Sequence, residues 1–177
     1  VTLDDFAETD CIFFFGQNVG SNSPRMLHDL QDARQRGIPI VTFNPLKERG
    51  LIEFLNPQRP AEMLTGASTP ISSQYHQVKA GGDIAALLGL CKALIEADDI
   101  AKRQGGRPVL DCAFIEQHTH GFEALVDAVR GYDWSELEAR SGLSRSALEA
   151  AATVYAQAEK VIGIYGMGLT QHRNGVE

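Results

Sequence analysis

The chain has 177 residues, of which 44% are hydrophobic, and its 16 Lys and Arg against 23 Asp and Glu give a formal net charge of −7. Its length is that of about one domain with a sizeable core. The acidic balance argues against a nucleic-acid-binding protein, which needs a basic patch. No apolar run approaches the ~20 residues that cross a bilayer, and the acidic N-terminus lacks the basic and apolar segments of a signal peptide. We therefore expect a cytoplasmic protein whose partners are neither nucleic acid nor membrane.

The first third of the chain predicts a βαβ unit. Residues 11–15 (CIFFF) form a short apolar run typical of a strand buried on both faces. Ser23 and Pro24 suit the N-cap and first position of a helix that ends near Gly37. Residues 38–43 (IPIVTF) predict the next strand, which should be parallel to the first and joined to it by a right-handed crossover.

A long connection follows. Residues 44–75 hold four of the seven prolines and show poor periodicity, so we expect an irregular insertion with one short helix around residues 51–55. Loops of this length are often functional or face a partner. Residues 74–79 are consistent with a short strand.

The remaining sequence is mainly helical. Asp83 opens a long amphipathic helix. Shorter helices are predicted over 111–119, 121–131, 133–142 and 144–159, and residues 160–168 predict a last buried strand that runs into glycines. The pattern predicts one α/β domain over 1–177, a Rossmann-like three-layer sandwich with a mostly parallel, incomplete sheet. The start at Val and the stop after a glycine motif suggest a fragment of a larger protein.

Metal-binding patterns are absent from the sequence. The cysteines, Cys11, Cys91 and Cys112, form no C-x-x-C pair, so we expect neither a zinc site nor an iron–sulfur cluster here. His118 and His120 are two residues apart, which puts them on different sides of a helix. We assign no metal ligand within the chain.

Polar and glycine-rich segments follow the predicted strands, where ligands collect in open parallel sheets. The segments are Gly16-Gln17-Asn18, Asn44-Pro45, Gly166-Met167-Gly168 and, if 74–79 is a parallel strand, Gly81-Gly82-Asp83. Glycine lets backbone N–H groups approach a ligand closely, and a helix N-terminus favours phosphate. Asp83 is a candidate guanine acceptor and a candidate helix N-cap, and one residue can do both. The G-x-G-x-x-G fingerprint and the Walker loop are both missing, which disfavours ordinary NAD and ATP sites.

Four motifs in order resemble the molybdopterin oxidoreductase family. They are "DFAETDCIFFFGQNVGSNSPRM", "ARQRGIPIVTFNP", "QVKAGGDIAALLGLCKALIEAD" and the run that ends in "GMGLTQHRNGVE", and together they cover nearly the whole chain. The last motif is similar to formate dehydrogenase-like members. One departure concerns the family's Asp-Pro-Arg, which here is Asn44-Pro45-Leu46, so an acid and an arginine are lost. Lys47 could partly replace that cation.

The resemblance implies a region that helps to bind bis-molybdopterin guanine dinucleotide (bis-MGD). Gly16, Gln17 and Asn18 would line the dinucleotide. Gly81, Gly82 and Asp83 would approach the guanine or its ribose. The residues implied near the pterin are Gly166, Met167, Gly168, Thr170 and Gln171, with His172 at a family position of unassigned role.

The family's molybdenum ligand and any cluster-binding cysteines lie upstream of this segment. The resemblance therefore implies no catalytic residue here, and it implies an enzyme only as the full-length protein, with the rest of the polypeptide and electron-transfer subunits as partners. Two alternatives stay open. One is the FAD-binding central domain of a thiamine-diphosphate enzyme, and the other is a non-catalytic α/β interaction scaffold.

Overall fold

The computed structural model describes residues 2–172, whose contacts divide into two compact units. Of the described residues, the sheet unit comprises 2–77 and 158–172, and the helical unit comprises 78–157. A single domain over 1–177 stays a prediction, because the existence of two compact units does not decide whether they fold as one.

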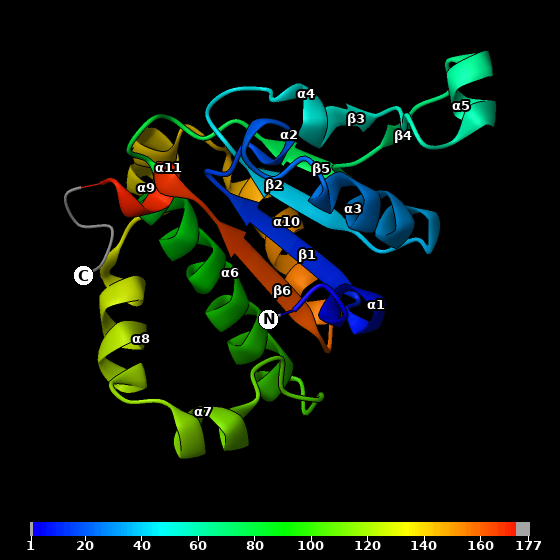
Figure 1. Cartoon of the computed structure of the whole chain (residues 1–177). Helices are drawn as coiled ribbons and strands as arrows, with labels where there is room; N and C mark the ends of the chain where they lie inside the picture. Colours follow the sequence, from blue (N-terminus) through cyan, green and yellow to red (C-terminus); the bar gives the residue numbers. More distant parts are fainter. Residues whose placement is uncertain (1, 173–177) are drawn as a thin grey trace. The chain divides into compact units, whose positions relative to one another are not determined.

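The sheet unit is built on four parallel strands. They are β1 (Cys11–Phe15), β2 (Ile40–Phe43), β5 (Gln74–His76) and β6 (Val161–Tyr165), in the order β5-β2-β1-β6 (Figure 1). In the register, Ile12 of β1 lies opposite Ile40 of β2 and Ile162 of β6. The predicted α/β class with a parallel sheet is confirmed, as are the strands expected at 11–15, within 38–43 and within 74–79.

Within residues 2–172, the sheet unit holds six short helices. They are α1 (Asp5–Glu8), α2 (Val19–Asn22), α3 (Met26–Gln35), α4 (Arg49–Ile52), α5 (Pro60–Thr65) and α11 (Met167–Thr170). The helix expected to start at Pro24 begins at Met26, because residues 19–22 form a separate turn capped by Asn18. Ser23 is therefore the C-cap of α2 and does not cap α3.

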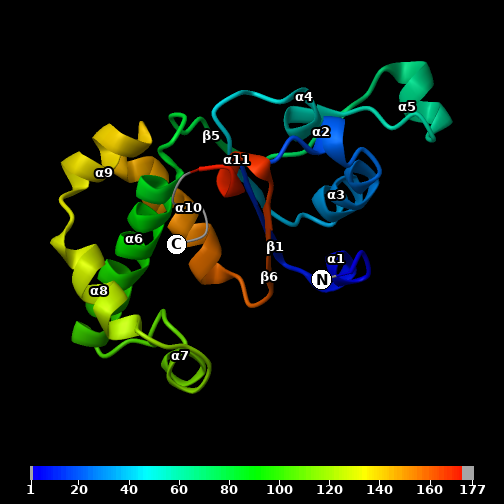
Figure 2. The ribbon, with the colours of Figure 1, turned by 60° about the vertical axis from the view of Figure 1, so that its left-hand side comes forward.

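The core of the sheet unit lies between the sheet and helices α1 and α3. Both helices lie on the same side of the strands in Figures 1 and 2. Alternate side chains of a strand point to opposite faces, so Ile12 and Phe14 of β1 enter this core. The other buried members are Phe6, Val19, Leu27, Leu30, Ala33, Ile40, Leu51, Ile71 and Ile162.

The opposite face of the sheet carries a row of stacked aromatic rings. Ring centroids are 5.4 Å apart for Phe15 and Phe43 and 4.8 Å apart for Phe43 and His76. Burial lowers the pKa of His76. The row ends at the carboxyl edge of the sheet.

The insertion is more ordered than expected. In place of one helix, residues 44–75 contain α4 and α5, and strands β3 (Glu53–Phe54) and β4 (Thr69–Pro70) pair antiparallel between them. The helix expected around 51–55 is α4, which ends earlier, at Ile52.

A buried polar network fastens the insertion to α3. Gln31, which has no exposed surface, donates from Nε2 to the Glu62 carboxylate (3.1 Å to each oxygen) and to Thr69 Oγ1 (2.9 Å). Its Oε1 accepts from Asn56 Nδ2 at 2.8 Å, and the same amide nitrogen lies 3.0 Å from His28 Nδ1. We call these five residues the insertion network. Its partners are 25 to 38 residues apart in sequence, which is why no local pattern revealed it.

The helical unit consists of the five predicted helices. They are α6 (Asp83–Arg103), α7 (Cys112–His118), α8 (Phe122–Gly131), α9 (Trp134–Ser141) and α10 (Arg145–Gln157). Helix α6 packs against α8, α9 and α10. The α6–α10 approach is close, because a Cβ at Gly89 would lie 2.6 Å from Leu148 Cδ1.

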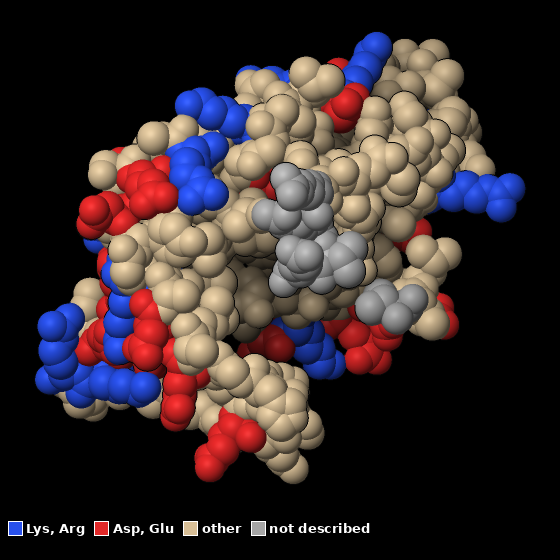
Figure 3. All heavy atoms as spheres, turned by 90° about the vertical axis from the view of Figure 1, so that its left-hand side faces the viewer, with Lys and Arg blue, Asp and Glu red and all other residues tan. Residues whose placement is uncertain are grey.

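Acidic and basic side chains are intermingled on the face shown in Figure 3. Ion pairs in the helical unit include Arg130–Asp99 (2.9 Å) and Arg145–Glu149 (2.6 Å). Within residues 2–172, no helix combines the length and the apolar character that a membrane span requires.

Candidate functional site

Three of the segments singled out from the sequence meet at the carboxyl edge of the parallel sheet. Hydrogen bonds continue past the strand ends there: Gly16 N–H donates to Phe43 O (3.0 Å), Asn44 N–H to His76 O (3.1 Å) and Gly166 N–H to Phe15 O (3.2 Å). The segments 16–18, 44–45 and 166–168 therefore leave the sheet side by side. This follows from the parallel pairing of β1 with both β2 and β6.

Gly16 and Gly168 are in direct backbone contact. Gly168 N–H donates to Gly16 O at 3.2 Å. A Cβ at Gly16 would lie 2.9 Å from the carbonyl carbon of Gly168, and a Cβ at Gly168 would lie 2.6 Å from Gly16 O. Gly16 also has φ = +57°, a region that side chains disfavour. The two glycines allow the loops after β1 and β6 to touch.

Gln17 and Asn18 are engaged by neighbouring backbone. A Cβ at Gly166 would lie 2.1 Å from Gln17 Oε1, so the Gln17 side chain lies directly over that glycine. Asn18 Oδ1 accepts from Ser21 N–H at 3.2 Å and caps α2.

The Asn44-Pro45 turn is held by hydrogen bonds within the chain. Asn44 is buried, and its Nδ2 donates to Leu46 O at 2.6 Å. The Tyr75 hydroxyl donates to the same oxygen at 2.6 Å and accepts from Glu48 N–H at 3.0 Å. Burial raises the pKa of Tyr75, although its hydrogen bond to Glu48 opposes this. Tyr75 thus fixes the path of the chain from residue 46 to 48.

The segment implied near the pterin forms the short helix α11. Met167 is 61% exposed, and the Thr170 hydroxyl lies 3.8 Å from its sulfur. Gln171 is exposed and its N–H donates to Met167 O, and His172 is half-buried. The end of the motif, residues 173–177, lies outside the described residues.

The fourth segment, Gly81-Gly82-Asp83, belongs to the helical unit. Gly82 packs against the end of α9, because a Cβ there would lie 2.7 Å from Arg140 O. Gly82 is the N-cap of α6, and Asp83, which is buried, is its first helical residue. The expectation that Asp83 caps the helix is therefore wrong by one position. Gly81 has φ = +79° and no neighbour within 4 Å of a Cβ.

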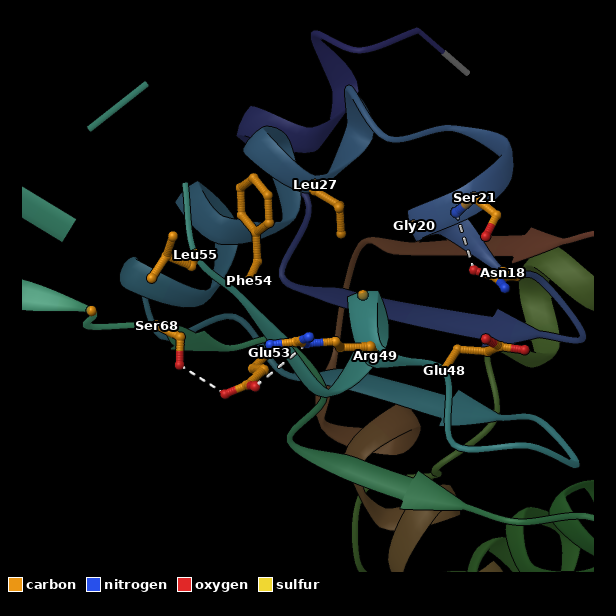
Figure 4. Close-up of a pocket in the computed structure, with 12 residues that line it drawn as sticks. Asn18, Gly20, Ser21, Leu27, Glu48, Arg49, Glu53, Phe54, Leu55 and Ser68 are labelled. Atoms are coloured by element: carbon orange, nitrogen blue, oxygen red, sulfur yellow. Dashed lines mark hydrogen bonds and ion pairs between the residues drawn. The ribbon is translucent and has the colours of Figure 1, made fainter. Parts of the chain in front are cut away.

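A cavity of about 540 Å³ opens in the sheet unit beside the loop after β1 (Figure 4). Asn18, Gly20 and Ser21 come from that loop and α2, and Glu48 and Arg49 come from the start of α4. The insertion contributes the rest of the lining, which is Gly50, Glu53, Phe54, Leu55, Gly66 and Ser68, with Leu27 from α3. Gly20 and Gly50 let α2 and α4 meet, since a Cβ at Gly50 would lie 2.9 Å from Gly20 Cα.

Sequence reasoning missed most of this lining. Of the predicted site residues, Asn18 alone belongs to it. Arg49 is 92% exposed in its side chain and pairs with Glu53 at 3.9 Å. Lys47, the cation singled out from the sequence, does not line the cavity. The glycines of "NVGSN" and "KERGL" were the sequence feature that could have indicated this cavity. Their role is evident only from the structure, in which Gly20 and Gly50 are in close contact.

The described residues contain no group of three or more His, Cys, Asp or Glu side chains that could hold a metal ion. Burial also makes Cys11 and Cys91 poor nucleophiles. The pKa of Cys11 is raised to about 11 by burial and by the nearby Asp10, and burial raises the pKa of Cys91.

No protein-family model matches the chain. The chain is 44% identical over all 177 residues to "Protein YdeP" of Escherichia coli (strain K12), and 29% identical over 175 residues to "Formate dehydrogenase H" of the same organism. These relatives fit the predicted resemblance to the molybdopterin oxidoreductase family. The chain spans less than a quarter of these relatives, 23% of the first and 21% of the second.

Among solved structures, the chain is similar to acetylene hydratase from Pelobacter acetylenicus, with a TM-score of 0.73 and 21% sequence identity. The match covers 96% of this chain and 20% of that protein. At this identity the likeness establishes a shared fold. Both kinds of comparison therefore relate these residues to one part of a larger protein.

Proposed function

We propose that these residues help to bind bis-MGD in a molybdenum-dependent, formate dehydrogenase-like oxidoreductase. The observation that carries the proposal is the meeting of the loops after β1, β2 and β6 at one edge of the sheet, beside a cavity of about 540 Å³. Ligands of open parallel sheets bind at this edge.

The glycines of the motif act by shaping this edge. The space beside Gly16, Gly166 and Gly168 is filled by atoms of the chain itself. A Cβ added at any of these glycines would lie only 2.1 to 2.9 Å from the nearest atom. These glycines therefore position the loops and do not leave a hollow for a ligand. Contacts to the cofactor would come from neighbouring side chains.

The donors that face the cavity suit a phosphate. Asn18 Oδ1 is used by Ser21 N–H, so the Asn18 amide presents its Nδ2 group, with the Ser21 hydroxyl beside it (Figure 4). The Arg49 guanidinium can supply charge-assisted hydrogen bonds to phosphate oxygens. Glu48, a carboxylate in the same lining, can accept N–H groups from a guanine edge. This set fits the nucleotide end of the cofactor.

The bound cofactor would supply the two-electron redox chemistry, and the protein would bind and orient it. Asn18, Ser21 and Arg49 would hold phosphate oxygens. Met167 of α11 and Gln171 just after this helix, both exposed, would face the pterin side. We propose no catalytic residue and no metal ligand in this chain. The remainder of the polypeptide and electron-transfer subunits would be its partners, in the cytoplasm.

The decisive experiment is metal analysis with pterin fluorescence on the full-length protein. The proposal predicts molybdenum or tungsten together with two pterins per polypeptide. Bound FAD without either metal would favour the thiamine-diphosphate alternative. A folded protein with no metal, pterin or flavin would favour the interaction scaffold.

A further inference from the structure

The insertion forms one wall of the cavity beside the loop after β1. Two short segments supply this wall: Glu53, Phe54 and Leu55 come from β3 and the residue after it, and Gly66 and Ser68 precede β4. The Ser68 hydroxyl donates to the Glu53 carboxylate at 2.9 Å, so the two segments are joined to each other (Figure 4). A movement of the insertion therefore moves the whole wall.

Apolar packing does not hold this wall in place. Among residues 53–70, Asn56 alone is buried. The large apolar side chains of α5 face solvent, since Leu64 is 88% exposed and Met63 is 54% exposed. Strands β3 and β4 have two residues each, and an isolated two-stranded ribbon is at best marginally stable in water. The position of the wall therefore depends on polar contacts.

The insertion network is attached directly beside both wall segments. Asn56 follows Leu55 in the chain, and Thr69 follows Ser68. Both Asn56 and Thr69 bond to the side chain of Gln31 in α3, at 2.8 and 2.9 Å. One buried amide on α3 thus fixes the end of each wall segment.

His28 and Glu62 complete the attachment. The His28 ring meets the Phe54 ring edge-on, with centroids 5.4 Å apart, and its Nδ1 lies 3.0 Å from Asn56 Nδ2. Glu62 accepts from Asn56 N–H at 3.0 Å and from Gln31 Nε2 at 3.1 Å. The hydrogen bonds from Asn56 N–H and from Gln31 lower the pKa of Glu62 against the effect of burial, so this group is a carboxylate acceptor at neutral pH.

We propose that Gln31 is a positioning residue for the cavity: it fixes the insertion as a wall and so sets how long a bound nucleotide stays. This inference rests on the proposed function, because it takes the nucleotide end of bis-MGD as the occupant. Gln31 does not line the cavity, so its effect passes through the wall. Removing a group that orients ligand-binding residues lowers affinity roughly 10- to 100-fold in metal sites, and such losses are mostly faster release.

A charge exchange between two network residues tests the inference in the full-length protein. Gln31→Glu puts a second carboxylate where the Gln31 amide lies 3.1 Å from Glu62, so the two groups repel. Combining Gln31→Glu with Glu62→Gln returns one amide and one carboxylate to the pair. Pterin fluorescence measures the cofactor content per folded polypeptide and the rate of pterin release after dilution. We expect release roughly 10-fold faster in Gln31→Glu, and within about 3-fold of wild type in the double variant.

Asp98→Leu is the control for a general loss of stability. Asp98 is a buried carboxylate of the helical unit that accepts from Val109 N–H at 2.8 Å and Leu110 N–H at 3.1 Å. This variant should unfold more easily in denaturant and yet release pterin at the wild-type rate.

The outcomes separate the inference from the proposed function. If the wild type holds pterin and Gln31→Glu releases it no faster, the inference is wrong and the proposed function stands. A double variant as stable as the wild type that still releases pterin as fast as Gln31→Glu would also contradict the inference, as would equally fast release from Asp98→Leu. A wild-type protein without pterin would overturn the proposed function, and the inference with it.

Discussion

Two regions of the sheet unit hold distant segments together in opposite ways. At the carboxyl edge, the loops after β1 and β6 touch because Gly16 and Gly168 have no side chains. A Cβ at Gly16 would lie only 2.9 Å from the backbone of Gly168. In the insertion network, Gln31 joins α3 to the insertion because its polar atoms all find partners. The first contact tolerates no added atom, and the second tolerates no lost hydrogen bond.

The largest expected effect comes from adding one carbon at the loop contact. Gly16→Ala combines positive φ with a clash against Gly168 backbone, so we expect the free energy of unfolding to fall by about 2–4 kcal/mol. Denaturant unfolding measures this loss. Gly37→Ala is the matched control, because Gly37 has φ = +84° and no neighbour within 4 Å. Equal losses in the two variants would show that the loop contact contributes nothing.

The next effect tests the insertion network. Gln31→Leu leaves the Asn56 amide and the Thr69 hydroxyl without their buried partner, so we expect a loss of about 2–3 kcal/mol in the free energy of unfolding. The control is Gln58→Leu in the same insertion, where the side chain is exposed. Proteolysis between residues 52 and 70 should accelerate in the first variant alone. If the two variants behave alike, the network does not hold the insertion.

A smaller, pH-dependent effect is expected from His76 at the end of the aromatic row. Burial lowers its pKa in the folded protein, so below the unfolded value of about 6.5 the unfolded chain binds the proton more readily. The free energy of unfolding is therefore unaffected by His76 above about pH 6.5 and decreases as the pH falls below this value. His76→Gln should flatten the unfolding free energy between about pH 7 and 5, and the exposed His120→Gln should not. A wild-type protein whose stability is constant over this range would refute the assignment.

The smallest effect on stability, and the most specific for function, concerns Arg49. Its side chain is 92% exposed, so Arg49→Gln should change the free energy of unfolding by less than about 0.5 kcal/mol. In the full-length protein it should nevertheless lower the pterin content, because the cavity loses its cation. Lys47→Gln, two residues away and outside the cavity, should retain the cofactor. If Lys47→Gln lost the cofactor and Arg49→Gln retained it, Lys47 would be the phosphate-binding cation, and the nucleotide would bind outside this cavity.

Cofactor motifs and structural glycines look alike in a sequence. Gly16, Gly166 and Gly168 were singled out as ligand-facing positions, yet each is packed against the chain's own atoms. Gly82 likewise lies against α9, and Asp83 is buried in the first turn of α6. Ser21 and Arg49, whose polar side chains line the cavity, were not among the predicted site residues.

The amino-acid order by itself determined the strands of the parallel sheet and the helices of the helical unit. Apolar runs at 11–15, within 38–43 and within 160–168, separated by helical periods, are sufficient for a parallel sheet, because burial on both faces and right-handed crossovers leave few other arrangements. Only the tertiary structure decided which polar groups face a cavity and which bind one another. Gln31 with Asn56 and Gly20 with Gly50 are partners across 25 and 30 residues, and such pairings depend on how the insertion folds back onto α3, which no local pattern encodes.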